Sequence, residues 1–151
     1  MSLVGILTTA VLVSPLALAA RSHTFTATYL GHGTEMRSGS TVSGTGTAVG
    51  RGRLIGASTL RGSATGAVTS EKCVVFSGTV LLRGRPGSMR LAVRGAHACA
   101  TDATRVSFSG KATVIRGTST FAGARGTLSF TGRYVTQSGA VTISFRGSIS
   151  Y

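Results

Sequence analysis

The stretch Ala124-Arg125-Gly126-Thr127-Leu128-Ser129-Phe130-Thr131-Gly132-Arg133-Tyr134 alternates between two kinds of residue. Every even-numbered residue is apolar, aromatic or glycine, and every odd-numbered residue is Ser, Thr or Arg. Successive side chains of a β-strand point to opposite faces. This stretch therefore predicts a strand with one buried face and one exposed face.

The same two-residue period returns in eight successive stretches, and most connections between them are short. An even number of neighbouring antiparallel strands lets the first pair with the last, which leaves no free edge. We therefore predict an all-β fold, an eight-stranded antiparallel up-and-down barrel. Only the loops at 31–40 and 98–103 are long enough for a lid or mouth. The expected strands are residues 23–30, 41–55, 59–69, 73–83, 88–97, 104–116, 124–134 and 139–151.

The first twenty residues differ from the rest of the chain. An apolar run, Leu3–Val13, is followed by the small-residue site Ala17-Leu18-Ala19, as in a secretory signal peptide, although no Lys or Arg precedes Arg21. The alternatives are a buried segment of the domain and, less favoured at this length, a membrane span. We predict a cleaved signal peptide at 1–20, a single barrel domain at 21–151, and a secreted, extracellular protein without a transmembrane span.

The chain is strongly basic, with sixteen Lys and Arg, three acids and a formal net charge of +13. Such a charge predicts an anionic surface or polymer as partner. The Arg-rich, Asn-free composition is equally typical of a GC-rich genome, so composition alone can explain the charge. The polar faces of the expected strands carry the predicted basic surface, which consists of Arg53, Arg61, Arg90, Arg94, Arg105, Lys111, Arg125, Arg133 and Arg146.

Two cysteines, Cys73 and Cys99, predict a disulfide, because an even pair usually bridges in an oxidising compartment. A Pro-Gly turn between them folds the two strands back on each other. If Val80 faces Val93, Cys73 opposes Ala100. Direct pairing of the cysteines then requires a one-residue bulge.

A short unit recurs as Phe76-Ser77-Gly78, Phe108-Ser109-Gly110, Phe130-Thr131-Gly132 and Phe145-Arg146-Gly147. Its Phe and Gly share the inward face, where glycine lets a strand coil and leaves space beside the ring. The inward glycines therefore predict either a narrower barrel or an internal cavity. They include Gly44, Gly46, Gly62, Gly66, Gly78, Gly110 and Gly132.

The segment 114–126 resembles the Gly-Gly-Thr-Gly-x-Phe-x-x-Ala-x-Gly signature of the allene oxide cyclase and dirigent barrel superfamily. Arg116 and Ser119 stand where that signature has glycine. The resemblance implies chemistry by carboxylates, tyrosines and polar groups inside the barrel. Residues 25–36 offer only Glu35 against the acidic stretch of dirigent proteins, so no catalytic residue carries over. The agreeing positions are Gly117, Thr118, Phe121, Ala124 and Gly126.

The motif itself predicts a turn whose glycines permit positive φ, with Phe121 plugging one barrel end. On the inward faces, the polar candidates for a ligand pocket are Tyr29, His97, Tyr134 and Tyr151. Their alternative role is as core or rim residues.

Catalytic chemistry is disfavoured. Glu35, Glu71 and Asp102 are expected in different connections, so a carboxylate pair is not evident. No Gly-x-Ser-x-Gly elbow, metal-ligand spacing or phosphate-binding loop occurs, so no catalytic set, metal or cofactor is predicted.

The leading hypothesis is a secreted, non-enzymatic barrel that binds an apolar small ligand or an anionic partner or surface. The alternative is a dirigent-like or allene-oxide-cyclase-like enzyme, of the isomerase or cyclase class, that shapes a reactive substrate in the cavity. Nucleic-acid binding is a third hypothesis, supported by charge alone. The volume of the barrel interior discriminates between them, because a small closed interior would contradict the enzyme hypothesis and weaken the ligand carrier.

Overall fold

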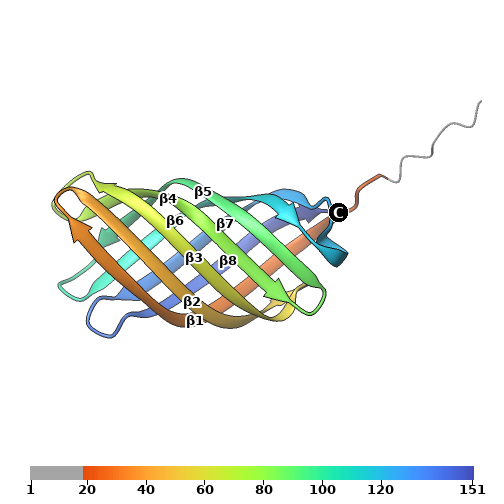
Figure 1. Cartoon of the computed structure of the whole chain (residues 1–151), viewed down its shortest axis with the longest axis horizontal. Helices are drawn as coiled ribbons and strands as arrows, with labels where there is room; N and C mark the ends of the chain where they lie inside the picture. The colour runs from red at the N-terminus through yellow and green to blue at the C-terminus, as the bar shows by residue number, and fades with distance from the viewer. Residues whose placement is uncertain (1–18) are drawn as a thin grey trace, which may run out of the picture.

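A computed structural model describes residues 19–151, which form one closed barrel of eight antiparallel strands in up-and-down order (Figure 1). The predicted fold is confirmed. The predicted signal peptide, residues 1–20, lies outside the described residues except for its last two. No helix within 19–151 has the length and apolar character needed to cross a membrane. The strands are β1 (Ser22–Ser38), β2 (Thr41–Arg53), β3 (Gly56–Val68), β4 (Cys73–Gly84), β5 (Gly87–Ala100), β6 (Arg105–Gly117), β7 (Arg125–Val135) and β8 (Ala140–Ser150).

The expected lid loops are mostly strand, so that prediction is wrong. Residues 31–38 continue β1 and pair with β2 up to Ser38 opposite Thr41. The two-residue period continues through this segment, and the ladder with β2 satisfies its backbone groups. Likewise, residues 98–100 belong to β5, which leaves only 101–104 as a connection.

The two ends of the barrel differ. The closed end holds both termini of the described barrel, the β2–β3 and β4–β5 turns, and the 3₁₀ turn η1 (Ser119–Phe121). Phe121 is fully buried there, and its ring meets Tyr151 edge-on at 5.3 Å between centroids, so it plugs this end. The opposite, open end holds the other four connections. The largest fully buried side chains are Tyr29, Phe25, Phe121, Phe145, Ile55, Leu82, Met89, Leu91, Leu128 and Ile149.

The four phenylalanines of the repeated unit form one cluster. The Phe130 ring centroid lies 6.5 Å from Phe76, 6.3 Å from Phe108 and 6.0 Å from Phe145. Across β6 and β7, Phe108 faces Gly132, and a Cβ at Gly132 would overlap the Phe108 ring. Some inward glycines therefore make room for a ring on the neighbouring strand.

A β-bulge at Gly95 brings the cysteines together. Gly95 has a φ of +61°, and its N–H donates to Ser77 Oγ at 3.1 Å. Beyond this bulge Cys73 lies directly opposite Cys99, and the two form a disulfide. The predicted disulfide is therefore confirmed. The bulge differs from the one that the predicted pairing required, because its extra residue lies on β5 rather than on β4.

Nearer the β4–β5 turn, the predicted pairing is wrong. Val80 faces Leu91 rather than Val93. The turn is shifted by one residue, because Gly84 pairs with Gly87 and Arg85-Pro86, rather than Pro86-Gly87, lies at its centre.

Candidate ligand-binding cavity

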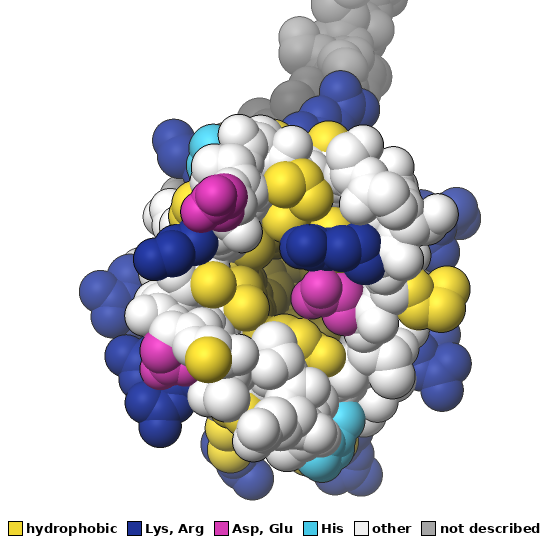
Figure 2. All heavy atoms as spheres, turned by 90° about the vertical axis from the view of Figure 1, so that its left-hand side faces the viewer, with side chains coloured by type: hydrophobic (Ala, Val, Ile, Leu, Met, Phe, Trp, Pro, Cys, Tyr) yellow, Lys and Arg dark blue, Asp and Glu magenta, His cyan; other side chains and the backbone are white. Residues whose placement is uncertain are grey.

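A cavity of about 420 Å³ occupies the open half of the barrel. Figure 2 looks into this end and shows a hollow with hydrophobic side chains inside. The space exists because much of the inward face of β1 to β4 has no side chain. The inward glycines of this wall are Gly33, Gly44, Gly46, Gly62, Gly66 and Gly78.

The floor of the cavity is aromatic and sealed. Phe130 and Phe145 line it, and the Tyr29 ring packs edge-on against Phe145 at 6.1 Å. Tyr29 itself is fully buried, and its hydroxyl hydrogen-bonds to Ser58 Oγ at 2.9 Å. Burial raises the pKa of Tyr29 more than its hydrogen bond with Ser58 lowers it, so the phenol is neutral. Tyr29 is therefore a core residue beneath the floor.

The walls above the floor are apolar. Phe76 and Phe108 are half-buried and present their rings to the cavity, since both are part of its lining. Aliphatic side chains cover the rest of this wall, and they include Val74, Val80, Val106, Val141 and Ile143. Such walls favour a ligand that loses apolar surface to the protein.

Of the four predicted pocket residues, only Tyr134 lines the cavity. Tyr29 lies in the core, and Tyr151 lies at the closed end, stacked on His23 at 4.6 Å. His97 is exposed on the outer wall, because the extra residue at the Gly95 bulge reverses the faces of β5. The expectation that Tyr29, His97 and Tyr151 line a pocket is therefore wrong.

Charged side chains surround the mouth, as Figure 2 shows. Glu35 and Arg37 come from the end of β1, and Glu71 and Lys72 come from the β3–β4 connection. From the sequence, Glu35 and Glu71 were expected in different connections. The signal that places Glu35 at the mouth is the inward parity it shares with Gly33.

The connections at the open end are tied to neighbouring elements. Each has at least one backbone hydrogen bond of 2.8–2.9 Å that reaches beyond its own hairpin. These run from Val68 N–H to Ser40 O, Ala100 N–H to Lys72 O, Thr136 N–H to Thr104 O, and Gly33 N–H to Gly139 O. The mouth is thus a continuous, hydrogen-bonded rim.

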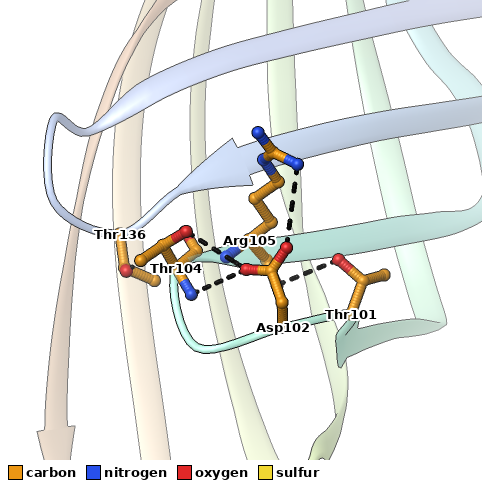
Figure 3. A network of polar contacts seen from close by, with 5 residues as sticks. All are labelled: Thr101, Asp102, Thr104, Arg105 and Thr136. Carbon is orange, nitrogen blue, oxygen red and sulfur yellow. Dashed lines mark hydrogen bonds and ion pairs between the residues drawn. The ribbon is translucent and has the colours of Figure 1, made fainter.

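Asp102 organises one of these connections (Figure 3). Its carboxylate accepts the backbone N–H groups of Thr104 at 2.8 Å and Arg105 at 2.9 Å. The Thr104 backbone hydrogen bond is the main cause that lowers the pKa of Asp102. Thr136 Oγ1 donates to Thr104 O at 3.2 Å, which joins the β5–β6 and β7–β8 connections.

Charge is distributed unevenly along the barrel. All nine residues of the predicted basic surface are exposed. The three acids of the chain, Glu35, Glu71 and Asp102, all lie at the open end. Among the nine, Arg105 lies beside an acid, with its guanidinium 3.8 Å from the Asp102 carboxylate. The remaining positive charge of the wall and the closed end lies away from the three acids.

Comparisons with protein families, curated proteins and solved structures found no match for this chain. Within 19–151, no three His, Cys, Asp or Glu side chains are grouped so that they could hold a metal ion. The function is therefore inferred from the cavity and the surface themselves.

Proposed function

We propose that this protein binds an apolar small molecule in the open half of its barrel. The observation that carries the proposal is the 420 Å³ cavity with apolar walls. Ligand sites typically enclose about 300–1,000 Å³ and are lined mainly by hydrophobic and aromatic side chains. Each Å² of apolar ligand surface removed from water contributes about 25 cal/mol toward binding.

The arrangement of the cavity sets how a ligand enters. Phe130 and Phe145 close its inner end, and Glu35 and Lys72 stand at its mouth. Because a buried charge is costly, the apolar part of a ligand goes in first and its polar part stays at the rim. The ligand is therefore expected to be elongated, with any polar group at one end.

The lining favours binding over catalysis. The titratable side chains that line the cavity within the described residues are Tyr134 and the charged groups of the mouth. General acid–base chemistry on a ligand at the floor would need a positioned proton donor or acceptor there. This supports a carrier or binding protein over the cyclase-like alternative. Common ancestry with the allene oxide cyclase and dirigent barrels stays a proposal, supported by the plug at Phe121.

Secretion is part of the proposal. The Cys73–Cys99 disulfide suits an oxidising compartment, where such bonds persist. The predicted signal peptide, residues 1–20, points in the same direction.

The test is a fluorescence titration with N-phenyl-1-naphthylamine, a neutral apolar probe, on the wild type and on Gly62→Phe. A Cβ at Gly62 would meet no atom closer than 3.6 Å, so a side chain there can extend into the cavity. We expect Gly62→Phe to weaken binding by about tenfold or more, equal to about 1.4 kcal/mol.

The control is Thr59→Phe, which adds the same ring to the exposed face of the same strand. It should bind the probe like the wild type. Equal affinity of Gly62→Phe and the wild type would contradict the proposed cavity site.

A further inference from the structure

Four exposed arginines occupy one side of the outer wall, on β3 to β6. Arg61 on β3 lies opposite Leu81 on β4, and Leu81 lies opposite Arg90 on β5. Arg90 in turn lies directly opposite Arg116 on β6. Arg83 follows on β4, two residues beyond Leu81. We call Arg61, Arg83, Arg90 and Arg116 the basic face.

A bulge creates the closest pair of this face. Arg90 faces Arg116, whereas the next residue, Leu91, faces Val114, so Ile115 is an extra residue on β6. Without the bulge, Arg116 would share the inward parity of Val114. With it, Ile115 and Arg116 are both exposed, and two guanidinium groups stand on neighbouring strands at the same level.

Nothing acidic offsets this pair. Like charges directly opposite each other on a sheet repel. The three acids of the chain lie at the open end, away from the register row of Arg90 and Arg116. An anion held between the two guanidinium groups would turn the repulsion into attraction.

Other arginines of the wall lack this arrangement. Arg146 on β8 lies between Thr26 and Ser129, and Arg133 on β7 lies between Ser107 and Thr142. Their directly opposed neighbours are hydroxyl residues. Lys111, Arg146 and Arg53 also share one row, but Ser129 and Thr26 separate them. The basic face therefore differs from the rest of the wall in its directly opposed pair, Arg90 and Arg116.

We propose that the basic face binds a phosphate-bearing polymer. The planar guanidinium fork donates two parallel hydrogen bonds to phosphate oxygens, and Arg90 with Arg116 offers two forks side by side. From Arg61 to Arg116 the row crosses three inter-strand steps of about 4.8 Å each. This length suits successive phosphates of one chain better than a single small anion.

The test compares two double variants that remove the same charge. Binding of long-chain polyphosphate is measured by calorimetry at several salt concentrations for Arg90→Gln/Arg116→Gln and for Arg133→Gln/Arg146→Gln. Each lost phosphate contact lowers the slope of log K against log salt by about one. The first variant should lose about two units of slope and bind at least about tenfold more weakly. The second should keep the wild-type slope.

Equal loss in the two variants would overturn the proposal, because net charge alone would then explain binding. Tighter binding of heparin than of polyphosphate would overturn the preference for phosphate. Binding to vesicles of anionic phospholipid but not to soluble polyphosphate would overturn the proposal that the partner is a polymer.

Two controls keep the test interpretable. The thermal midpoint of Arg90→Gln/Arg116→Gln should not fall, because the substitution relieves repulsion, and Arg61→Gln/Arg83→Gln supplies a second variant of the same face. N-phenyl-1-naphthylamine binding should be retained in both, since the basic face lies outside the cavity. A failure of the basic face is thus distinguishable from a failure of the proposed ligand site.

Discussion

The two halves of the barrel are built from the same eight strands, with the same alternation of inward and outward residues. The closed half is filled by core side chains, whereas the open half encloses a cavity. In the closed half the inward positions carry large side chains such as Phe25 and Leu82. In the open half many inward positions are glycines such as Gly44 and Gly62. The period of the strands sets the barrel, and the size of the inward residues sets which part of it is hollow.

Charge follows the same division. The open end combines acids and bases around the mouth and includes the Arg105–Asp102 ion pair, while the basic face has no acid beside it. The difference is the basis of the two proposals, an apolar ligand inside the barrel and an anionic polymer on its outer wall. Substitutions at each end can test this division.

The largest effect is expected for Phe121→Ala, which removes the plug of the closed end. Truncation of a fully buried phenylalanine costs about 3–5 kcal/mol of unfolding free energy. Phe76→Ala is the matched change in the open half, where the ring is only half-buried. It should cost clearly less. Urea unfolding measures the loss of unfolding free energy in both variants. Equal losses would contradict the division into a packed closed half and a hollow open half.

The disulfide should make the next largest contribution to the stability of the fold. Cys73→Ser/Cys99→Ser removes a link across 26 residues, and such a link stabilises by about 2–4 kcal/mol. Because the bridge lies near the open rim, hydrogen exchange should rise most at the β3–β4 connection and the end of β5. Uniform faster exchange around both ends would argue against a local role at the mouth.

Two glycine substitutions distinguish occupied from open space. Gly132→Ala should cost about 1–3 kcal/mol, because its Cβ would overlap the Phe108 ring. Gly62→Ala should be neutral or stabilise by up to about 1 kcal/mol, because it fills open space and restricts the unfolded chain. Thermal unfolding measures the stability of the two variants. A large loss of stability in Gly62→Ala would show that the cavity wall is already packed.

The smallest effect is expected for Asp102→Asn at the rim. The pKa of Asp102 is lowered in the folded protein, so its carboxylate stabilises the fold above the unfolded-state pKa. That contribution is lost as pH falls through the folded-state pKa. The variant should therefore unfold at a slightly lower temperature than the wild type at pH 7 and at the same temperature near pH 2. A difference that persists at pH 2 would contradict this role.

Local sequence pattern predicted the barrel and the Phe121 plug, because alternation and a glycine-flanked turn act over a few residues. It misplaced His97, since this residue follows the bulge at Gly95 that reverses inside and outside. The bulge at Ile115, which turns Arg116 outward, was not predicted either. A bulge depends on how two strands align along their whole length, which no local pattern contains. Register arithmetic around the cysteines predicted the disulfide partners but not the bulge at Gly95, because it began from Val80 opposite Val93 rather than Leu91.

The inward glycines were the other feature whose role could not be predicted from the sequence. Alternation places Gly62 and Gly132 on the same face, but only their neighbours decide that one borders empty space and the other lies against a ring. The cavity is therefore a property of the assembled barrel.

The most direct test of a hollow, ligand-binding open half is methyl NMR during titration with N-phenyl-1-naphthylamine. Shifts should concentrate on Val80 and Ile143, which line the cavity, and leave Ile55 and Ile149 at the closed end unchanged. Shifts confined to the closed end, or to exposed Val49 on the outer wall, would contradict the account.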